Sequence, residues 1–207
     1  SFTLSVGVSD ALDTAGTSAI SVSNIQYIQA SSDTPVEDIE LSLTTFGNTY
    51  EYGNKWNMST SSGSISQNLL ESGLKLATGT LDTSLGGTKT AINATEGSGL
   101  YATAKAKAGD TLTFNYTFST NDYSPYKDFS FVSINGNAKN IAAIGQEVSD
   151  YGTITSSYSY TLQNSDFDGD TVEIALGVVD ALDTAVSSNF SVWDLEINSA
   201  GTPPPSD

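Results

Sequence analysis

Hydrophobic and polar residues alternate along several short segments of the chain. The clearest is residues 112–118, where Thr and Asn occupy one face and the apolar side chains occupy the other, namely Leu112, Phe114, Tyr116 and Phe118. The same period of two occurs in residues 2–8, 158–162 and 172–178. Because successive side chains of a strand point to opposite faces, this period predicts half-buried β-strands.

Turn-forming residues separate these segments. Clusters of Gly, Asn, Asp and Ser lie between them, while Thr, Val, Tyr and Phe, which favour strands, are concentrated within them. Residues 65–77 could form one short helix, although Gly73 disfavours it. Several short strands with turn signals between them predict an all-β, jelly-roll-like β-sandwich with little helix.

The chain is strongly acidic. Its 207 residues carry 24 acidic side chains and 7 lysines, a formal net charge of −17 at pH 7. This field would repel nucleic acid and anionic lipid, so we expect neither as a partner. No apolar run approaches the roughly 20 residues of a membrane span, so direct membrane insertion is not expected.

The residue types available for catalysis are few. The chain has no His, the commonest general base near neutral pH, and no Cys for thiol chemistry. Paired carboxylates can hydrolyse glycosides, but no acidic pair is marked by its sequence surroundings as a proton donor. We therefore expect a protein that is not an enzyme.

Asp is twice as frequent as Glu, with 16 residues against 8. Its short side chain suits turns and oxygen-lined metal sites. Calcium, which takes about 6–8 oxygen ligands, is the natural counter-charge, and we predict it as the cofactor. The alternative is an acidic surface adapted to a salty environment.

One acidic segment occurs twice. The stretch GVSDALDTA near the start of the chain returns as GVVDALDTA 170 positions later, and 11 of 16 aligned positions match. Each copy places two carboxylates three residues apart in a loop, Asp10 and Asp13 in the first and Asp180 and Asp183 in the second. Such a pair can form part of a calcium shell, or each Asp can cap a turn.

The repeat allows two domain organisations. Either both copies belong to one sandwich, or residues 1–30 are the tail of a preceding module. We favour the first, which makes residues 1–198 a single module followed by a Pro-rich tail or linker at residues 199–207.

A second acidic segment combines carboxylates with aromatic residues. In TNDYSPYKDF, Asp122 and Asp128 bracket Tyr123, Pro125 and Tyr126. With calcium bound, such a loop could grip a ligand carboxylate or a sugar diol between its tyrosines. The alternative is a packed loop whose tyrosines seal one end of the sandwich.

The two acidic loops that follow predicted strands are expected to work together. Because aromatic residues accompany only the segment around residues 122–128, we predict that the Asp180–Asp183 loop lies beside it and helps to build a ligand site. The Asp10–Asp13 copy has no such aromatic neighbours, and we predict a mainly structural role for it.

Two further charged segments have simpler explanations. The stretch DFDGD, with Asp166, Asp168 and Asp170, matches a calcium loop only in part and is best explained as a hairpin turn between strands. Lys105 and Lys107 share one face of a predicted strand whose other face carries Ala, a pattern that protects an edge strand from unwanted pairing.

Two long segments together resemble a known family. EGSGLYATAKAKAGDTLTFNYTFSTNDYSPYKDFSFVSING and TVEIALGVVDALDTAVSSNFSVWDLEI are similar to the jelly-roll, calcium-dependent peptide-binding modules near the C-terminal end of giant RTX adhesins of marine and Vibrio bacteria. The resemblance covers roughly residues 90–197. Residues 31–89 contain no matching motif, and the additional N-terminal copy of the repeat departs from the family pattern.

The resemblance implies an extracellular module on the cell surface, joined to neighbouring modules of a longer adhesin, that captures a peptide or glycan on a host or neighbouring cell. In that family a calcium ion coordinates the ligand's carboxylate. Carried over to the matching loops, this implies calcium ligands at Asp122, Asp128, Asp180 and Asp183, with Tyr123 and Tyr126 as walls of the ligand pocket. Within binding, the alternative is a lectin that binds sugar diols through calcium. Outside binding, the alternative is a calcium-rigidified spacer in an adhesin stalk.

Overall fold

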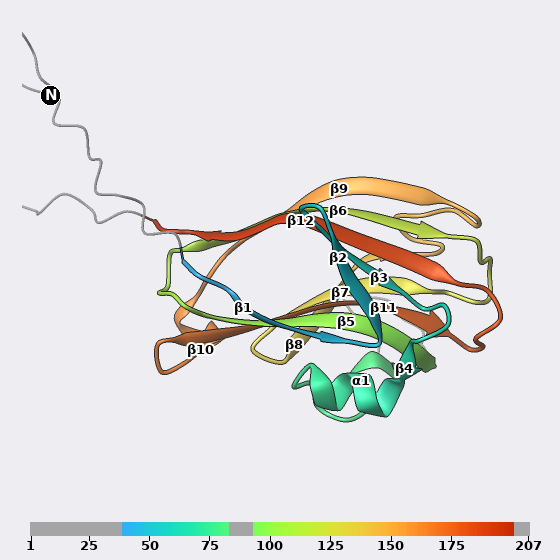
Figure 1. Ribbon diagram of the computed structural model, residues 1–207, viewed down its shortest axis with the longest axis horizontal. Coiled ribbons are helices and arrows are strands. Elements are labelled where there is room, and N and C mark those ends of the chain that lie inside the picture. Colours follow the sequence, from blue (N-terminus) through green and yellow to red (C-terminus); the bar gives the residue numbers. More distant parts are fainter. Residues whose placement is uncertain (1–38, 83–92, 201–207) are drawn as a thin grey trace, which may run out of the picture. The chain divides into compact units, whose positions relative to one another are not determined.

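A computed structural model describes residues 39–82 and 93–200. Residues 1–38, 83–92 and 201–207 lie outside the described residues, and with them lie the predicted strand at 2–8, Asp10, Asp13 and most of the Pro-rich tail. The described chain is a jelly-roll-like sandwich of two antiparallel sheets with one α-helix (Figure 1). This confirms the fold class predicted from the alternating pattern.

The first sheet has seven strands. Five form its main path, in the order β1 (Ser42–Phe46), β5 (Ala94–Lys105), β11 (Thr171–Ala181), β7 (Phe129–Ile134) and β8 (Asn137–Ala143). Two short strands lie off that path, with β4 (Ile65–Ser66) pairing with β5 and β10 (Phe167–Asp168) pairing with β11.

The second sheet has five strands. Their order is β2 (Asn48–Tyr52), β3 (Lys55–Ser59), β12 (Ser188–Asn198), β6 (Thr111–Thr120) and β9 (Thr153–Thr161). Two single-turn 3₁₀ helices, η1 (Thr80–Asp82) and η3 (Asn164–Asp166), complete the regular elements of the described residues.

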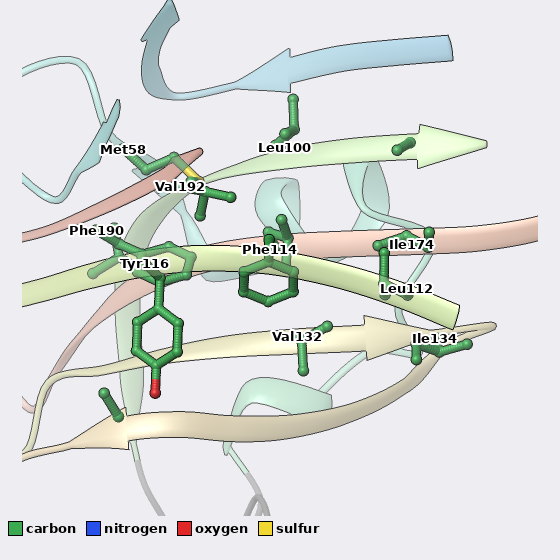
Figure 2. Packing of buried hydrophobic residues seen from close by; sticks show 14 of the residues in the cluster. Met58, Leu100, Leu112, Phe114, Tyr116, Val132, Ile134, Ile174, Phe190 and Val192 are labelled. Carbon is green, nitrogen blue, oxygen red and sulfur yellow. The ribbon is translucent and has the colours of Figure 1, made fainter. Parts of the chain in front are cut away.

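The main hydrophobic core lies between the two sheets (Figure 2). The four apolar residues whose alternation predicted β6 are all buried there, facing Leu100, Val132 and Ile174 of the first sheet. Fully burying a Leu or Phe side chain contributes about 1.5–3 kcal/mol. Alternation therefore identified correctly which face of β6 points inward.

The central strands of the first sheet are buried on both faces. A second core, which includes Leu81, Phe131 and Val179, lies on the side of the sheet away from the main core. Residues 172–178 were expected to be half-buried, yet every residue of β11 from Ile174 to Ala181 is buried. The reason is that α1 (Gln67–Gly73) and the chain after it cover this face.

The α-helix is shorter than residues 65–77, the range expected for it. Leu70 of the helix and Leu74, which immediately follows it, pack against β5 where that strand has glycines, so that a Cβ on Gly97 would lie 2.9 Å from Leu70 and a Cβ on Gly99 would lie 2.8 Å from Leu74. The absence of these side chains lets the helix approach the sheet closely. No helix in the described ranges is long and apolar enough to span a membrane.

Two expectations about charged segments have opposite outcomes. DFDGD forms a tight hairpin, with Asp168 paired to Thr171 across Gly169, whose φ is +68°. The prediction of edge protection at Lys105 is wrong because β5 lies between β1 and β11 in the sheet. Instead, the Lys105 ammonium lies 3.0 Å from the Asp170 carboxylate at the exposed end of the strand.

Candidate functional site

The acidic loops meet at one end of the sandwich, on the right in Figure 1. β11 pairs antiparallel with β7, and β12 pairs antiparallel with β6, so β6 and β11 end where β7 and β12 begin. The loop from residue 121 to 128 joins β6 to β7, and the loop from residue 182 to 187 joins β11 to β12. The fold therefore brings together two acidic segments that are more than fifty residues apart in sequence.

Asp128 is held inside this end of the molecule. It is fully buried, immediately before β7. Its Oδ1 accepts a hydrogen bond from the backbone amide of Ala181 at 3.0 Å, and its Oδ2 accepts one from the Ser188 hydroxyl at 2.6 Å. Both contacts come from the second acidic loop or its flanks, so Asp128 ties the two loops together.

Asp180 stands opposite Asp128. Val179 pairs with Phe129, so the next residues outward, Asp180 and Asp128, face each other across β11 and β7. Asp180 is 2% exposed, and no donor among the described residues is placed to give its carboxylate oxygens a well-formed hydrogen bond, although the Thr60 hydroxyl and the Asp128 carboxyl are close enough to affect its pKa. Buried polar groups are normally satisfied, so a carboxyl group in these surroundings is stable only when it is protonated or lies beside a cation.

Burial and proximity perturb both carboxyl groups. Burial raises the pKa of Asp180 to about 9, with the charge of Asp128 as the next cause. Burial also raises the pKa of Asp128 to about 6, although the hydrogen bonds from Ser188 and Ala181 act in the opposite direction. Two facing carboxylates cannot easily ionise together in such surroundings, so the pair retains a proton near neutral pH.

Asp122 and Asp183 complete the acidic cluster. Asp122 is buried just after β6, and burial raises the pKa of its carboxyl group, with a smaller contribution from the negative charge of Asp183. Asp183 is partly exposed and caps its own loop by accepting the backbone amide of Ala185 at 3.1 Å. On the neighbouring strand, the Thr95 hydroxyl donates to the backbone carbonyl of Asp183 at 2.7 Å.

A cluster of tyrosines lies next to the acids. Tyr123 is 42% exposed, and its ring lies 5.6 Å from that of Tyr151 in a stacked arrangement and 5.5 Å from that of Tyr126, edge to face. Tyr151 itself is 64% exposed. Its backbone amide donates to the carbonyl of Asp122 at 2.8 Å, which attaches this turn to the acidic loop.

Sequence reasoning missed three residues of this site. Tyr151 lies in an SDYG turn. An Asp directly before a Tyr occurs there as it does at residues 122 and 123, and this similarity could have identified Tyr151 as a candidate. Ser188 and Thr60 gave no signal, because their hydroxyls act only through tertiary contacts. The Thr60 hydroxyl accepts the backbone amide of Ser188 at 2.9 Å and thereby fixes the start of β12 beside Asp128.

The acidic cluster is not a complete set of metal ligands. Within residues 39–82 and 93–200, no group of three or more acidic side chains is arranged to hold a metal ion. A cation at the Asp128–Asp180 pair would therefore need backbone carbonyls, hydroxyls or water to fill its shell. Asp10 and Asp13, the other predicted ligands, lie outside the described residues.

Comparisons with known proteins identify no family. No family model and no curated protein matches the chain. The fold has weak likenesses to a protein of Cowpea mosaic virus empty particles (10% identity, TM-score 0.25, 82% of this chain and 93% of that one) and to a GH31 alpha-xylosidase from Xanthomonas citri (8% identity, TM-score 0.21, 77% and 19%).

Proposed function

We propose that this chain is a calcium-dependent ligand-binding module, with a peptide as ligand, from a secreted bacterial adhesin of the RTX type that attaches to cell surfaces. The observation that carries the proposal is the unpartnered, buried carboxylate of Asp180 facing Asp128 in the acidic cluster. A buried acidic pair with one member unsatisfied is costly unless a proton or a cation compensates it.

Calcium fits the chemistry of this cluster. It prefers oxygen ligands, accepts irregular geometry and takes about 6–8 of them. Asp128 and Asp180 would supply carboxylates, with Asp122 and Asp183 close by and backbone carbonyls and water available at the loop ends. Magnesium fits less well because it demands regular octahedral geometry.

The surface beside the acids suits a ligand with a carboxylate and an apolar neighbour. Tyr123 and Tyr151 present exposed rings next to the acidic loops. Leu182, in the Asp180–Asp183 loop, is 47% exposed and has a φ of +76°, a conformation that is rare for leucine. Strained, exposed apolar residues of this kind are concentrated at binding sites.

The proposal is tested with an array of peptides and glycans, probed in calcium and in EDTA. We expect calcium-dependent binding to peptides with a free C-terminal carboxylate and loss of that binding when the carboxylate is amidated. The Asp180→Asn variant should lose binding, whereas Asp170→Asn, which changes an exposed acid in the hairpin between β10 and β11, should retain it.

Three other results would contradict the proposal. Calcium-dependent binding to glycans alone would make the chain a lectin. Calcium-dependent stabilisation with no ligand retained on either array would make it a spacer. Binding to peptides that persists in EDTA would remove calcium from the ligand site.

A further inference from the structure

The outward face of the second sheet is a regular lattice of uncharged polar side chains. Strand pairing places one residue from each of the five strands in each row across this face. The row through the middle of the sheet runs Tyr50, Asn57, Ser191, Thr117 and Thr155.

The rows on either side have the same character. One contains Asn48, Ser59, Asn189, Ser119 and Thr153, and the other contains Tyr52, Lys55, Trp193, Asn115 and Ser157. Same-face residues repeat about every 6.8 Å along a strand, and neighbouring strands are about 4.8 Å apart. The face therefore carries a grid of mostly hydroxyl and amide groups at these spacings.

Aromatic side chains lie on this face at the edge strand β2 and on the central strand β12. Tyr52 is 79% exposed and Tyr50 is 55% exposed, so neither ring contributes much to the core. Trp193 is half-buried on the same face, with the Lys55 ammonium 4.1 Å from the centre of its ring. Flat, exposed aromatic rings with polar tips are suited to stacking against the apolar faces of sugar rings.

A groove crosses the face at the other end of β6. It has a volume of roughly 460 Å³ and is lined by Thr113, Asn115, Ser157, Ser159, Asp194 and Glu196, among others. The bulge in β12 between Trp193 and Glu196 puts Asp194 at a φ of +52°, where its carboxylate accepts the Asn115 amide at 3.0 Å. Carboxylate and amide groups in one groove can bind vicinal hydroxyls through paired hydrogen bonds.

We propose that this face is a second binding surface, independent of calcium, for neutral polysaccharide chains. The exposed rings of Tyr50 and Tyr52 would stack on sugar rings, and the groove beside Asp194 would hydrogen-bond their hydroxyls.

Charge favours a neutral partner. The three rows carry a single charged side chain, Lys55, and the groove adds two acids, Asp194 and Glu196. On a protein of net charge −17, an anionic polysaccharide would be repelled. A cationic chain would be drawn to the acidic cluster at the end of the sandwich rather than to a face of hydroxyls and amides. A neutral, hydroxyl-rich chain would be neither repelled by the net charge nor drawn to the acidic cluster, and it can hydrogen-bond the hydroxyl and amide groups of this face.

The test is affinity electrophoresis of the whole chain in native gels that contain EDTA. The net charge drives the protein toward the anode, and a bound polysaccharide retards it. The probes are xyloglucan, galactomannan, mixed-linkage β-glucan and dextran, with anionic alginate for comparison. We expect at least one neutral polysaccharide to retard the protein and alginate to have no effect.

Variants of the face locate the binding. The double variant Tyr50→Ala, Tyr52→Ala and the groove variant Asn115→Ala should each raise the dissociation constant at least tenfold, with melting temperatures that show a retained fold. Tyr151→Ala, which removes an exposed ring at the acidic end, and Asp180→Asn should not change it.

Three results would overturn the proposal: no retardation in EDTA by any neutral polysaccharide, retardation unaffected by the face variants, or retardation that occurs only in parallel gels with calcium and is lost in Asp180→Asn. The last result would assign the glycan to the acidic cluster. Because the gels contain EDTA, failure of the calcium-dependent function would leave this measurement unchanged.

Discussion

Asp128 and Asp180 face each other across β7 and β11 with unequal support. Asp128 accepts two hydrogen bonds, from the Ala181 amide and the Ser188 hydroxyl, while Asp180 accepts none from the described residues. The pair is stable only if a proton or a cation reduces its charge. The first four predictions below test which of the two does so.

Removal of calcium should lower the melting temperature. An ion that binds only the native state stabilises it by mass action, by about 4 kcal/mol at a thousandfold excess over its dissociation constant. We expect the melting temperature to fall in EDTA, to recover with calcium and to recover less with magnesium. Differential scanning fluorimetry measures this, and superimposable curves in EDTA and calcium would exclude a structural calcium ion.

Replacing Asp180 by Asn should abolish this calcium response. The amide keeps the shape of the side chain but cannot supply a negative charge to a cation. Because the amide is neutral without taking up a proton, whereas Asp180 must be protonated to remain buried beside Asp128, the variant in EDTA should be at least as stable as the parent at pH 8. Asp168→Asn, an exposed substitution in the β10–β11 hairpin, is the matched control and should keep the calcium response. Isothermal titration with calcium would show a retained affinity in Asp180→Asn if the pair were not the site.

In EDTA, stability should fall as the pH rises. The pKa of Asp180 is raised in the native state to about 9 and that of Asp128 to about 6, so between pH 4 and pH 9 the native state binds more protons than the unfolded chain. Its free energy of unfolding then decreases with pH, by at most about 1.4 kcal/mol per pH unit for each such proton. Urea melts at several pH values should show this slope in the parent and a shallower one in Asp180→Asn.

Calcium should weaken that dependence. Calcium binding requires ionised carboxylates and releases their protons, so its affinity should increase over the same pH window. Urea melts in saturating calcium should therefore be flatter with pH than those in EDTA, and equal slopes in both would contradict a shared site.

Loss of the Ser188 hydroxyl should destabilise the protein whether or not calcium is present. In Ser188→Ala, Asp128 Oδ2 loses a buried donor at 2.6 Å, and leaving such a group unsatisfied costs about 1–3 kcal/mol. Chemical denaturation measures the change. Ser187→Ala, at the partly exposed neighbouring position, should have little effect.

Glu71 should prove essential to the layer that covers the first sheet. It is 1% exposed, and its carboxylate accepts the backbone amides of Gly79 at 2.8 Å and Leu81 at 2.7 Å. Glu71→Ala leaves both amides without this partner and should lower the free energy of unfolding by about 3 kcal/mol. Glu40→Gln, at an exposed position, is the control, and equal losses in the two variants would contradict the structural role.

Strand content and the location of turns could be predicted from the sequence. Thr111–Thr120 alternates apolar and polar residues because one face meets the core and the other meets water, and this local pattern appears directly in the sequence. The same reasoning found the turn at Gly169, where a short acidic stretch with glycine connects two strands. The acidic and aromatic loops were visible as well, since their composition is local.

What only the tertiary structure decided is which residues lie side by side. Lys105 was assigned to an edge strand, but the order of strands in a sheet depends on pairings between segments far apart in the chain, which no local pattern encodes. The burial of Asp180 could not be predicted from the sequence for the same reason. It results from the antiparallel pairing of β11 with β7, which sets it against a carboxylate 52 residues earlier in the chain, and from the Thr60–Ser188 contact that closes this end of the sandwich. A carboxylate's pKa and its need for a partner depend on the low dielectric and the charges around it, and only the folded chain creates that environment.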